Sequence, residues 1–446
     1  MSTAPKVTPS IGVDLTKAPD PELSDRPFDP RHYWDRDIWK AEWDKIWTRT
    51  WQVAAMTNQF KNPGDFVTLE FGQEVILAVM GSDHVIRCFY NVCQHRGMML
   101  VTQEVGTAPL GRLTCPYHAW SWDVNGTLKT VPDEPNFDKS LNCKTKHLIP
   151  IKTETWGGFV WFNMDDDCLP LRQSLEPLVD HLDAYPMEEM VRTLWVTIEG
   201  DFNWKLVQDN FNESYHTFHA HPQLKYVAEF SYRYSQFDMY PSGHARMLMP
   251  GGAPSRTVKG GDDEVLRQLG EHVRFWGLDP EDFRGRIHDL RAALQHQKRL
   301  LGAEKGYDFS RFDDAMLTDN WHYTIFPNLS FSLKPDGNIW LRARPHPSDP
   351  EKCFFDMWYL NWFPKGQDRY YSPSLRDWVD MSTPAPHQKG KAGDYTMGPT
   401  IDQDVAIWGA QQKALHSRGY KQEILAGQEA RVRYFHDNLE KWMNRP

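Results

Sequence analysis

The chain has 446 residues, a formal net charge of −10, a pI near 6.0 and 40% hydrophobic residues. This length suits two or three domains, and the acidic balance argues against nucleic acid or an anionic membrane as the main partner. No apolar run is long enough to span a bilayer, the start lacks the apolar core of a signal peptide, and the few scattered cysteines suggest no disulfide framework. We therefore expect a cytoplasmic protein.

The first part of the chain predicts an arm, a helix and a small β domain. Residues 1–49 are expected to form an extended arm and an amphipathic helix that pack on the larger, C-terminal domain. Residues 50–165 read as short strands separated by turn signals such as Asn62-Pro63-Gly64 and Gly81-Ser82-Asp83. This pattern predicts a compact all-β domain.

Residues 166–446 predict a second, α+β domain. A helix is expected at 171–185, strands at 190–200, 225–250 and 320–365, and helices at 404–417 and 428–444. The order favours a curved antiparallel sheet around long C-terminal helices. Residues 256–315 predict two inserted helices, which form either a solvated hairpin or a lid or entry channel over a pocket.

Two short Cys/His pairs lie within the predicted β domain. Cys93-Gln-His95 and Cys115-Pro-Tyr-His118 provide two thiolates and two imidazoles, separated by a loop. Such a set suits either one tetrahedral zinc ion or a 2Fe-2S cluster of Rieske type. Zinc sites more often show Cys-x-x-Cys pairs, whereas here each half offers one Cys and one His, which favours the cluster.

A second polar stretch, Asn203–Pro222, holds three histidines and two carboxylates. Asp209, Glu213 and His216 would share one face of a helix, since they are four and three residues apart. His216 and His221 reach one metal only if the helix loosens or ends after His216, and Pro222 is consistent with such a break. The residues alone leave two interpretations open, a metal site and a polar helix end with solvated histidines.

The Cys/His pairs carry a resemblance to a known family. Cys93 to Gly97, Cys115 to Trp120 and the following Asn125-Gly126 resemble the Rieske motif of ring-hydroxylating oxygenase alpha subunits. Ala119 departs from the Gly that is more frequent in that family. The family implies a small all-β Rieske domain plus a catalytic domain of helix-grip (START-like) fold.

The second stretch is similar to the mononuclear iron motif of the same family. The pattern Glu213-x-Tyr-His216-x4-His221-Pro implies that His216 and His221 bind Fe(II) with a distant carboxylate. Asp404 is the expected third ligand and Asp402 the alternative. Glu213 matches the acid that links the two metal centres in relatives, and the Glu is typical of those that oxidise carnitine- or choline-like amines.

The resemblance implies a terminal oxygenase with two cofactors per chain, one Rieske 2Fe-2S cluster and one mononuclear Fe(II). The cluster would be held by Cys93, His95, Cys115 and His118. The expected partners are a ferredoxin or NAD(P)H reductase, O2 and a small substrate. The family also implies a homotrimer or larger multiple, with or without a small beta subunit.

The substrate and the type of oxygenation stay open at this point. The family favours hydroxylation or dihydroxylation of an aromatic compound during its catabolism; the alternative is a monooxygenase or demethylase of a quaternary amine or methoxy compound. Rivals of another kind are a Rieske electron-transfer protein and a binding protein that has lost its iron. No Arg is clearly placed to hold a carboxylate. Six aromatic residues of the strands either frame a substrate or fill the core: Trp321, Tyr323, Phe326, Trp340, Trp358 and Trp362.

Overall fold

The computed structural model describes residues 17–137, 141 and 145–445. These residues form two compact units. The larger unit holds the described residues up to Trp39, Leu175–Pro345 and those from Pro350 onward, and the smaller one holds Lys40–Ser174 and His346–Asp349. The units divide after Trp39 and after Ser174, where the sequence predicted boundaries after residues 49 and 165.

The N-terminal helix is shorter and less regular than predicted. A 3-10 turn at Pro30–Tyr33 precedes α1 (Arg36–Glu42), which continues as a π-helical turn over Trp43–Trp47. Residues 17–39 of the predicted arm and helix belong to the larger unit, where the Ser24 backbone N–H donates to Asp437. The prediction for residues 1–16 lies outside the described residues.

The smaller unit is built on antiparallel strands, as the turn signals predicted. Its seven-stranded sheet has the order β1-β10-β9-β4-β3-β2-β5, and a three-stranded sheet has the order β6-β7-β8. The strands are β1 (Gln52–Met56), β2 (Asp65–Phe71), β3 (Glu74–Met80), β4 (Ile86–Tyr90), β5 (Val105–Thr107), β6 (Arg112–Thr114), β7 (Ser121–Asp123), β8 (Leu128–Thr130), β9 (Pro150–Trp156) and β10 (Phe159–Asn163).

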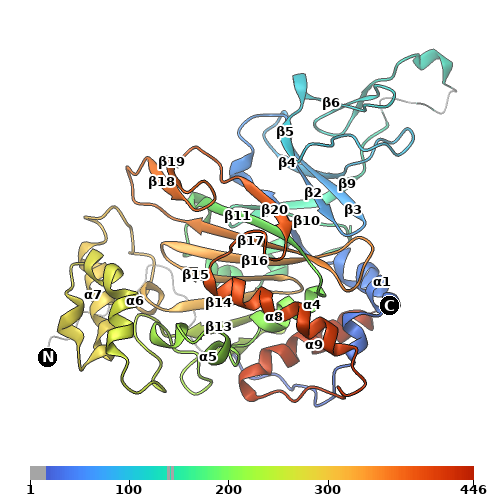
Figure 1. Cartoon of the computed structure of the whole chain (residues 1–446). Coiled ribbons are helices and arrows are strands. Elements are labelled where there is room, and N and C mark those ends of the chain that lie inside the picture. Colours follow the sequence, from blue (N-terminus) through green and yellow to red (C-terminus); the bar gives the residue numbers. More distant parts are fainter. Residues whose placement is uncertain (1–16, 138–140, 142–144, 446) are drawn as a thin grey trace. The chain divides into compact units, whose positions relative to one another are not determined.

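The larger unit is organised around an eight-stranded sheet of order β12-β13-β14-β15-β16-β17-β11-β20 (Figure 1). All of its pairs are antiparallel except β11 with β20. Its strands are β11 (Val191–Gly200), β12 (Gln236–Met239), β13 (Ala245–Met249), β14 (Asn320–Ile325), β15 (Leu329–Lys334), β16 (Gly337–Pro345), β17 (Cys353–Asn361) and β20 (His387–Lys391); β18 (Arg369–Ser372) and β19 (Asp377–Asp380) form a separate hairpin.

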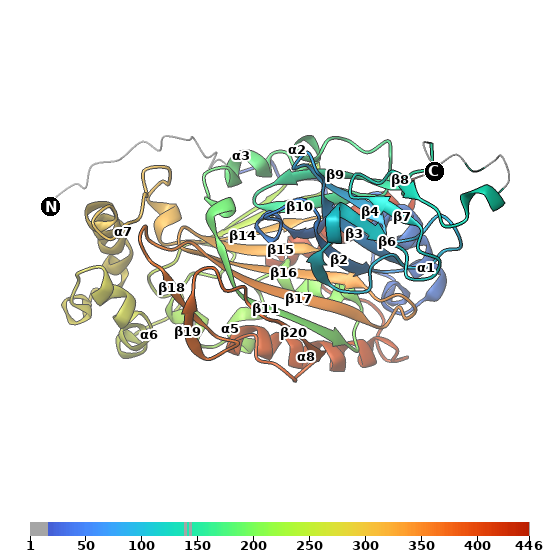
Figure 2. The ribbon, with the colours of Figure 1, turned by 90° about the horizontal axis from the view of Figure 1, so that it is seen from above.

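The helices cover the sheet and one of its ends. α4 packs on β15, β16 and β17, and α8 and α9 contact α4. In both ribbon views α6 and α7 lie together at one end of the sheet (Figures 1 and 2). The helices are α2 (Leu171–Ser174), α3 (Leu178–Leu182), α4 (Trp204–Phe211), α5 (Thr217–Ala220), α6 (Asp262–Phe275), α7 (Leu290–Leu301), α8 (Pro399–Leu415) and α9 (Ala430–Met443).

Aromatic packing fixes α4 and α8 on the sheet. The Trp408 ring of α8 meets the rings of Phe211 and Phe355 edge-on, at centroid distances of 5.8 and 5.3 Å. Trp408 and Phe355 are fully buried, and a buried aromatic ring removes about 150–250 Å² from water. These contacts set how α8 is rotated about its axis, and therefore which of its side chains face α4.

The structure confirms the predicted α+β class, the antiparallel sheet and the two C-terminal helices. α8 begins at Pro399, five residues earlier than the sequence predicted, because Pro is well suited to the first turn of a helix. Strand β20 was missed because it lies in the Pro/Gly-rich stretch after residue 383. None of the described helices combines the length and the apolarity that crossing a membrane requires.

Candidate metal centres and cavity

The two Cys/His pairs lie in loops with the same backbone hydrogen bonds. In the first loop Gly97 N donates to Cys93 O at 3.1 Å and Cys93 N donates to Met98 O at 2.8 Å. In the second loop Ala119 N donates to Cys115 O at 3.0 Å and Cys115 N donates to Trp120 O at 2.8 Å. The two loops therefore share one backbone arrangement, although the His is the third residue of the first loop and the fourth residue of the second.

The fifth residue of each loop has a left-handed backbone. Gly97 has φ +73° and Ala119 has φ +55°, so the second loop places a side chain where glycine is favoured. This explains why Gly suits that position better, although Ala119 makes the same backbone hydrogen bond as Gly97.

The side chains of the two loops fit an iron–sulfur cluster. Cys93 and Cys115 are buried, and the rings of His95 and His118 lie 4.7 Å apart. The Nδ1 atoms of both histidines are buried and have no hydrogen-bond partner among the described residues. Two buried thiols and two orphaned imidazole nitrogens are the ligand set of a Rieske cluster, which would satisfy all four. The His95 ring also stacks on Trp120 at 4.7 Å, which fixes its orientation.

The second candidate centre forms where α4 ends. α4 stops at Phe211, Asn212 caps it, and the short α5 follows His216. His221 has non-helical angles of φ −126° and ψ 62°. The residues between the two histidines are helical, and the expected end of the helix after His216 lies at His221. The two rings are 5.1 Å apart between their centroids.

Asp404 of α8 completes this cluster. One ligand atom from each of His216, His221 and Asp404 lies within 4.8 Å of the others. Asp404 Oδ1 is 2.8 Å from His221 Nε2 and 3.5 Å from His216 Nε2. Two atoms that bind one ion at about 2.1 Å and at right angles are about 3.0 Å apart, so these separations suit a shared metal ion.

Hydrogen bonds at the opposite ring nitrogens favour the same conclusion. His221 Nδ1 lies 2.8 Å from Gln403 Oε1, and His216 Nδ1 contacts Glu213 Oε1. If both Nδ1 atoms donate, both Nε2 lone pairs face the Asp404 carboxylate. Burial lowers the pKa of His216, but Glu213 and Asp404 raise it above its ordinary value, which shows that the cluster attracts positive charge. A divalent cation fits this donor set.

Two predicted carboxylates lie elsewhere. Asp402 accepts hydrogen bonds from Thr396 Oγ1 at 2.6 Å and from Met397 N at 2.8 Å, so it is not part of the histidine cluster. Asp209 accepts from Tyr33 at 2.6 Å and lies 2.9 Å from His436 Nε2. The expectation that Asp209, Glu213 and His216 share a helical face is wrong, because α4 ends before Glu213.

The triad opens on a cavity of about 810 Å³ within the larger unit. Apolar side chains from β13, β16 and the segment after α5 line much of it, among them Val227, Phe230, Met247, Met249 and Leu341. Its volume lies toward the upper end of the range of about 300–1,000 Å³ that is typical of small-molecule sites.

Comparison with known proteins identifies the architecture. Residues 187–445 match the model of the ring hydroxylating alpha subunit (catalytic domain), and residues 50–148 match that of the Rieske [2Fe-2S] domain. The chain belongs to the ring-hydroxylating alpha-subunit family. It thus has one domain of the type that carries a 2Fe-2S cluster and one of the type that binds mononuclear iron.

The curated relatives of this alpha subunit act on different substrates. The chain is 31% identical over 192 residues to the glycine betaine monooxygenase oxygenase subunit of Pseudomonas aeruginosa, covering 43% of this chain and 44% of that one. It is 26% identical over 315 residues to the benzene 1,2-dioxygenase subunit alpha of Pseudomonas putida, covering 68% of this chain and 64% of that one. The chain thus spans about half to two thirds of the length of these curated relatives.

A solved structure of a quaternary ammonium Rieske monooxygenase shares the fold of this alpha subunit. The TM-score is 0.67 at 18% identity, and the match covers 94% of this chain and 95% of that one. At this identity the likeness establishes the fold and leaves the substrate open.

Most of the aromatic residues that the sequence highlighted do not line the cavity of this alpha subunit. Of the six that the sequence highlighted, only Trp362 lines it. Tyr323 and Trp340 stack on Phe331, at 5.5 and 4.4 Å, on the face of the sheet opposite to His322 and Ser332. The alternative interpretation, that these residues fill the core, therefore holds for the rest, which are all buried.

The insert forms a wall of the cavity. α6 contributes Leu269 and His272 to the lining, and α7 contributes Leu294 and Lys298. The interpretation of the insert as a purely solvated hairpin is wrong, because these side chains face the cavity.

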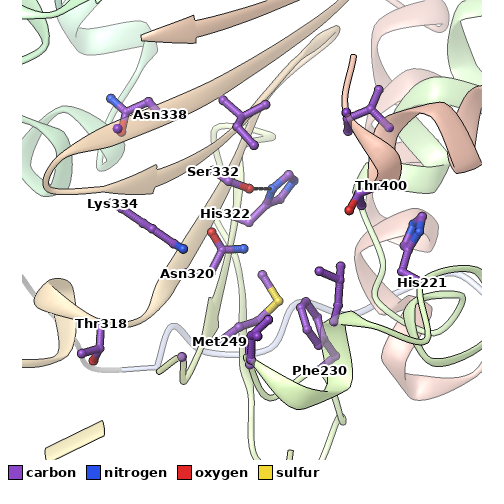
Figure 3. A pocket seen from close by; sticks show the side chains of 18 of the residues that line it. His221, Phe230, Met249, Thr318, Asn320, His322, Ser332, Lys334, Asn338 and Thr400 are labelled. Carbon is purple, nitrogen blue, oxygen red and sulfur yellow. Dashed lines mark hydrogen bonds between the residues drawn. The ribbon is translucent and has the colours of Figure 1, made fainter. Parts of the chain in front are cut away.

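Sequence reasoning also missed a row of polar residues on the cavity face of the sheet. His322 of β14 pairs with Ser332 of β15, and the His322 Nδ1 to Ser332 Oγ distance is 3.0 Å. Asn320 and Lys334 follow on the same face of their strands (Figure 3). The signal was available: polar residues recur at alternate positions, 320, 322 and 324, then 330, 332 and 334, on strands that are otherwise buried.

Proposed function

We propose that the chain is the terminal oxygenase component of a multicomponent system and inserts oxygen from O2 into a small organic substrate. The observation that carries the proposal is the His216–His221–Asp404 cluster, which opens on a large cavity in a chain that also holds two Cys/His loops. When bound, the two iron groups supply one-electron transfer and the activation of O2.

We propose roles for the residues around these groups. Cys93, His95, Cys115 and His118 hold the cluster, and His216, His221 and Asp404 hold the mononuclear iron from one side. Glu213 and Gln403 each fix one histidine, since the Nδ1 proton of the ring is engaged and Nε2 is left to bind metal. Apolar walls keep bulk water away from the reacting end of the substrate.

Electron delivery needs a separate ferredoxin or NAD(P)H reductase, because the sequence carries no flavin or NAD fingerprint. Inter-subunit electron transfer is described for a quaternary ammonium Rieske monooxygenase of the same fold. We propose that Glu213 serves such a path here, in a homotrimer or larger multiple, with or without a beta subunit. A cytoplasmic location and a role in aromatic catabolism also stay predictions from the sequence.

Our first proposal is an aromatic substrate, since the chain matches the benzene dioxygenase alpha subunit over 315 residues and the glycine betaine enzyme over 192 residues. The second candidate is oxidation of a quaternary amine, which the higher identity to the glycine betaine enzyme and the presence of Glu213 favour. For the aromatic substrate we propose hydroxylation or dihydroxylation, and for the quaternary amine or methoxy compound monooxygenation or demethylation.

The test is an oxygen electrode assay with the purified protein, a Rieske-type reductase and NADH. Candidate substrates are aromatic hydrocarbons, aromatic acids and betaines. We expect substrate-dependent O2 consumption coupled to an oxygenated product that incorporates label from 18O2. A reducible cluster with no product from any of these classes would instead support the electron-transfer protein.

A further inference from the structure

The charged side chains that line the cavity fall into two groups. Glu213 and Asp404 lie beside the histidines of the triad, whereas Lys298, Lys334 and Asp336 interact with one another. In the close-up view His221 and Lys334 lie on opposite sides of the pocket (Figure 3). The end away from the triad is therefore the end that holds the lysines.

Lys298 is a buried lysine in this wall, where burial lowers the pKa of its ammonium and the charge of Asp336 opposes that shift. Its side chain is 3% exposed, and its Nζ donates to the Leu317 carbonyl at 2.8 Å. It also lies 5.5 Å from the centre of the Trp276 ring. An ammonium has three donors, so this carbonyl leaves capacity for another acceptor.

The polar groups of Lys334 and Asn320 are available for a ligand. Lys334 extends into the cavity toward Asn320 in the close-up view (Figure 3). Neither side chain makes a hydrogen bond or ion pair with the residues that the structure describes. Continuing the β14–β15 register by one residue beyond the Trp321–Leu333 pair sets Asn320 opposite Lys334.

The charges at this end do not cancel. Burial raises the pKa of Asp336, but Lys298 and Lys334 lower it more, so this carboxylate is ionised at neutral pH. Burial and the charge of Lys298 lower the pKa of His272 to about 4, so its ring is neutral. Two lysines, the buried Lys298 and the more exposed Lys334, face one carboxylate, so an anion at this end of the cavity meets a net positive charge.

We propose that this end of the cavity, formed by Lys298, Lys334 and Asn320, binds a carboxylate on an extended, mostly apolar substrate whose other end lies at the triad. The inference names the substrate class of the proposed oxygenase and rests on that function for what happens at the reacting end. The binding itself depends only on the cavity.

The middle of the cavity fits the same class of molecule. Burial and the charge of Arg431 lower the pKa of His322 to about 3, so the ring is neutral, and its Nε2 has no partner among the described residues. Ser332 holds Nδ1, so Nε2 is available to a hydroxyl or carbonyl between the two ends of the substrate. The volume of about 810 Å³ equals that of roughly 27 waters at about 30 Å³ each, more than one small ring fills.

The same charges disfavour a quaternary ammonium group at this end. Two lysines repel such a cation, and a single carboxylate that already faces both lysines offers little attraction. These charges thus assign the carboxylate to this end of the cavity, and either an aromatic ring or the quaternary ammonium of a betaine, which also carries a carboxylate, lies at the triad.

The test is direct binding of three fluorescent compounds to the full-length holoprotein, measured by fluorescence anisotropy. The compounds share one anthracene core: anthracene-2-carboxylate, anthracene-2-carboxamide and (anthracen-2-yl)trimethylammonium. We expect the carboxylate to bind about tenfold or more tightly than the amide, and the cation to bind most weakly, since charge-assisted hydrogen bonds exceed neutral ones.

The variant is Lys334→Met, which removes the more exposed of the two ammonium groups and keeps an unbranched side chain. We expect it to weaken binding of the carboxylate about tenfold and to change binding of the amide less than about twofold. Lys334→Arg restores the preference, and Lys259→Met, an exposed lysine that does not line the cavity, leaves it unchanged.

The proposal is overturned if the carboxylate binds no better than the amide, if none of the three compounds binds, or if Lys334→Met weakens carboxylate and amide alike. Each of these results leaves product formation by the wild type untouched. A wild-type protein that keeps the carboxylate preference but never forms product refutes the proposed oxygenase activity and leaves the anion site standing.

Discussion

The two candidate metal centres are assembled in opposite ways. In the smaller unit, each Cys/His pair lies within a loop of six residues that closes on itself through two backbone hydrogen bonds. In the larger unit, His221 and Asp404 are 183 residues apart and meet only because α8 packs against α4. The first centre depends on local chain geometry and the second on the tertiary fold.

The difference also governs how each ligand is oriented. In the loops the His95 ring is held by stacking on Trp120, a neighbour within the motif of the second loop. In the triad the orienting groups are polar and specific: Glu213 contacts His216, and Gln403 contacts His221. A change in the sheet or in α8 should therefore disturb the triad and leave the loops intact.

The largest expected effect, on product formation, comes from removing one ligand of the triad. His221→Ala should lower product formation by on the order of 1,000-fold or more, because the stabilisation that a metal ion gives the transition state amounts to several kcal/mol. Iron content should fall from about three atoms per chain, two in the cluster and one in the triad, to two, with the visible spectrum of the cluster unchanged.

The matched control for this prediction is His219→Ala, an exposed histidine of α5 two residues away. It should keep both the iron content and the activity. An unchanged iron count in His221→Ala would contradict the assignment of the triad as the metal site.

The second prediction concerns the sheet that supports the triad. Asp356 of β17 is buried, and its Oδ2 accepts from Arg342 Nε and Arg344 Nε, both at 2.7 Å. Asp356→Asn leaves two buried guanidinium groups without their counter-charge, and we expect the free energy of unfolding of this unit to fall by about 3–5 kcal/mol. Urea denaturation followed by circular dichroism measures the loss.

Asp377→Asn serves as the control, since Asp377 is exposed on the β18–β19 hairpin. It should shift the midpoint little. The absorbance of the cluster in the smaller unit should survive at urea concentrations that unfold the sheet of Asp356→Asn; simultaneous loss of both signals would show that the two units unfold as one.

The contrast explains which parts of the molecule the sequence predicts. The Cys/His loops follow from contiguous residues, and the antiparallel sheet and the C-terminal helices follow from periodicity. The choice between Asp402 and Asp404 does not follow from the sequence. Residues two apart on a helix point about 200° from each other, and only the rotation of α8 decides which one faces the histidines. That rotation is set by Trp408 packing on Phe211 and Phe355, three residues brought together from distant segments.

The cavity could not be predicted from the sequence, for a related reason. The alternation of strand residues shows that 320, 322 and 324 share one face but does not show whether that face lines a cavity or the core. Trp321 and Tyr323 attracted attention as aromatic residues, yet they lie on the other face. Lys298 lies on an inserted helix whose position over the sheet no local pattern reveals.

The third prediction separates orientation of a ligand from binding of the metal. Glu213→Ala removes the contact with His216 Nδ1 but none of the three triad ligands. We expect both centres to stay filled while product formation falls about 10- to 100-fold, the usual cost of losing a carboxylate that orients a metal ligand. Iron analysis and the rate at which the reduced cluster is reoxidised by O2 and substrate check it; full turnover in this variant would refute the role of Glu213.

The smallest expected effect, on stability, comes from the fifth position of the two Cys/His loops, where one loop has Ala and the other has Gly. Ala119 has φ +55° where the first loop has Gly97 at φ +73°. A left-handed backbone costs a non-glycine residue about 1–2 kcal/mol, and the added freedom of glycine in the unfolded chain cancels about 0.4–1 kcal/mol of the gain. Ala119→Gly should therefore stabilise the smaller unit by up to about 1.5 kcal/mol, whereas Gly97→Ala, which meets no neighbour within 4 Å, should destabilise it by a similar amount. Thermal melts followed at the cluster absorbance measure both, and shifts of equal sign in the two variants would show that the loops are not equivalent.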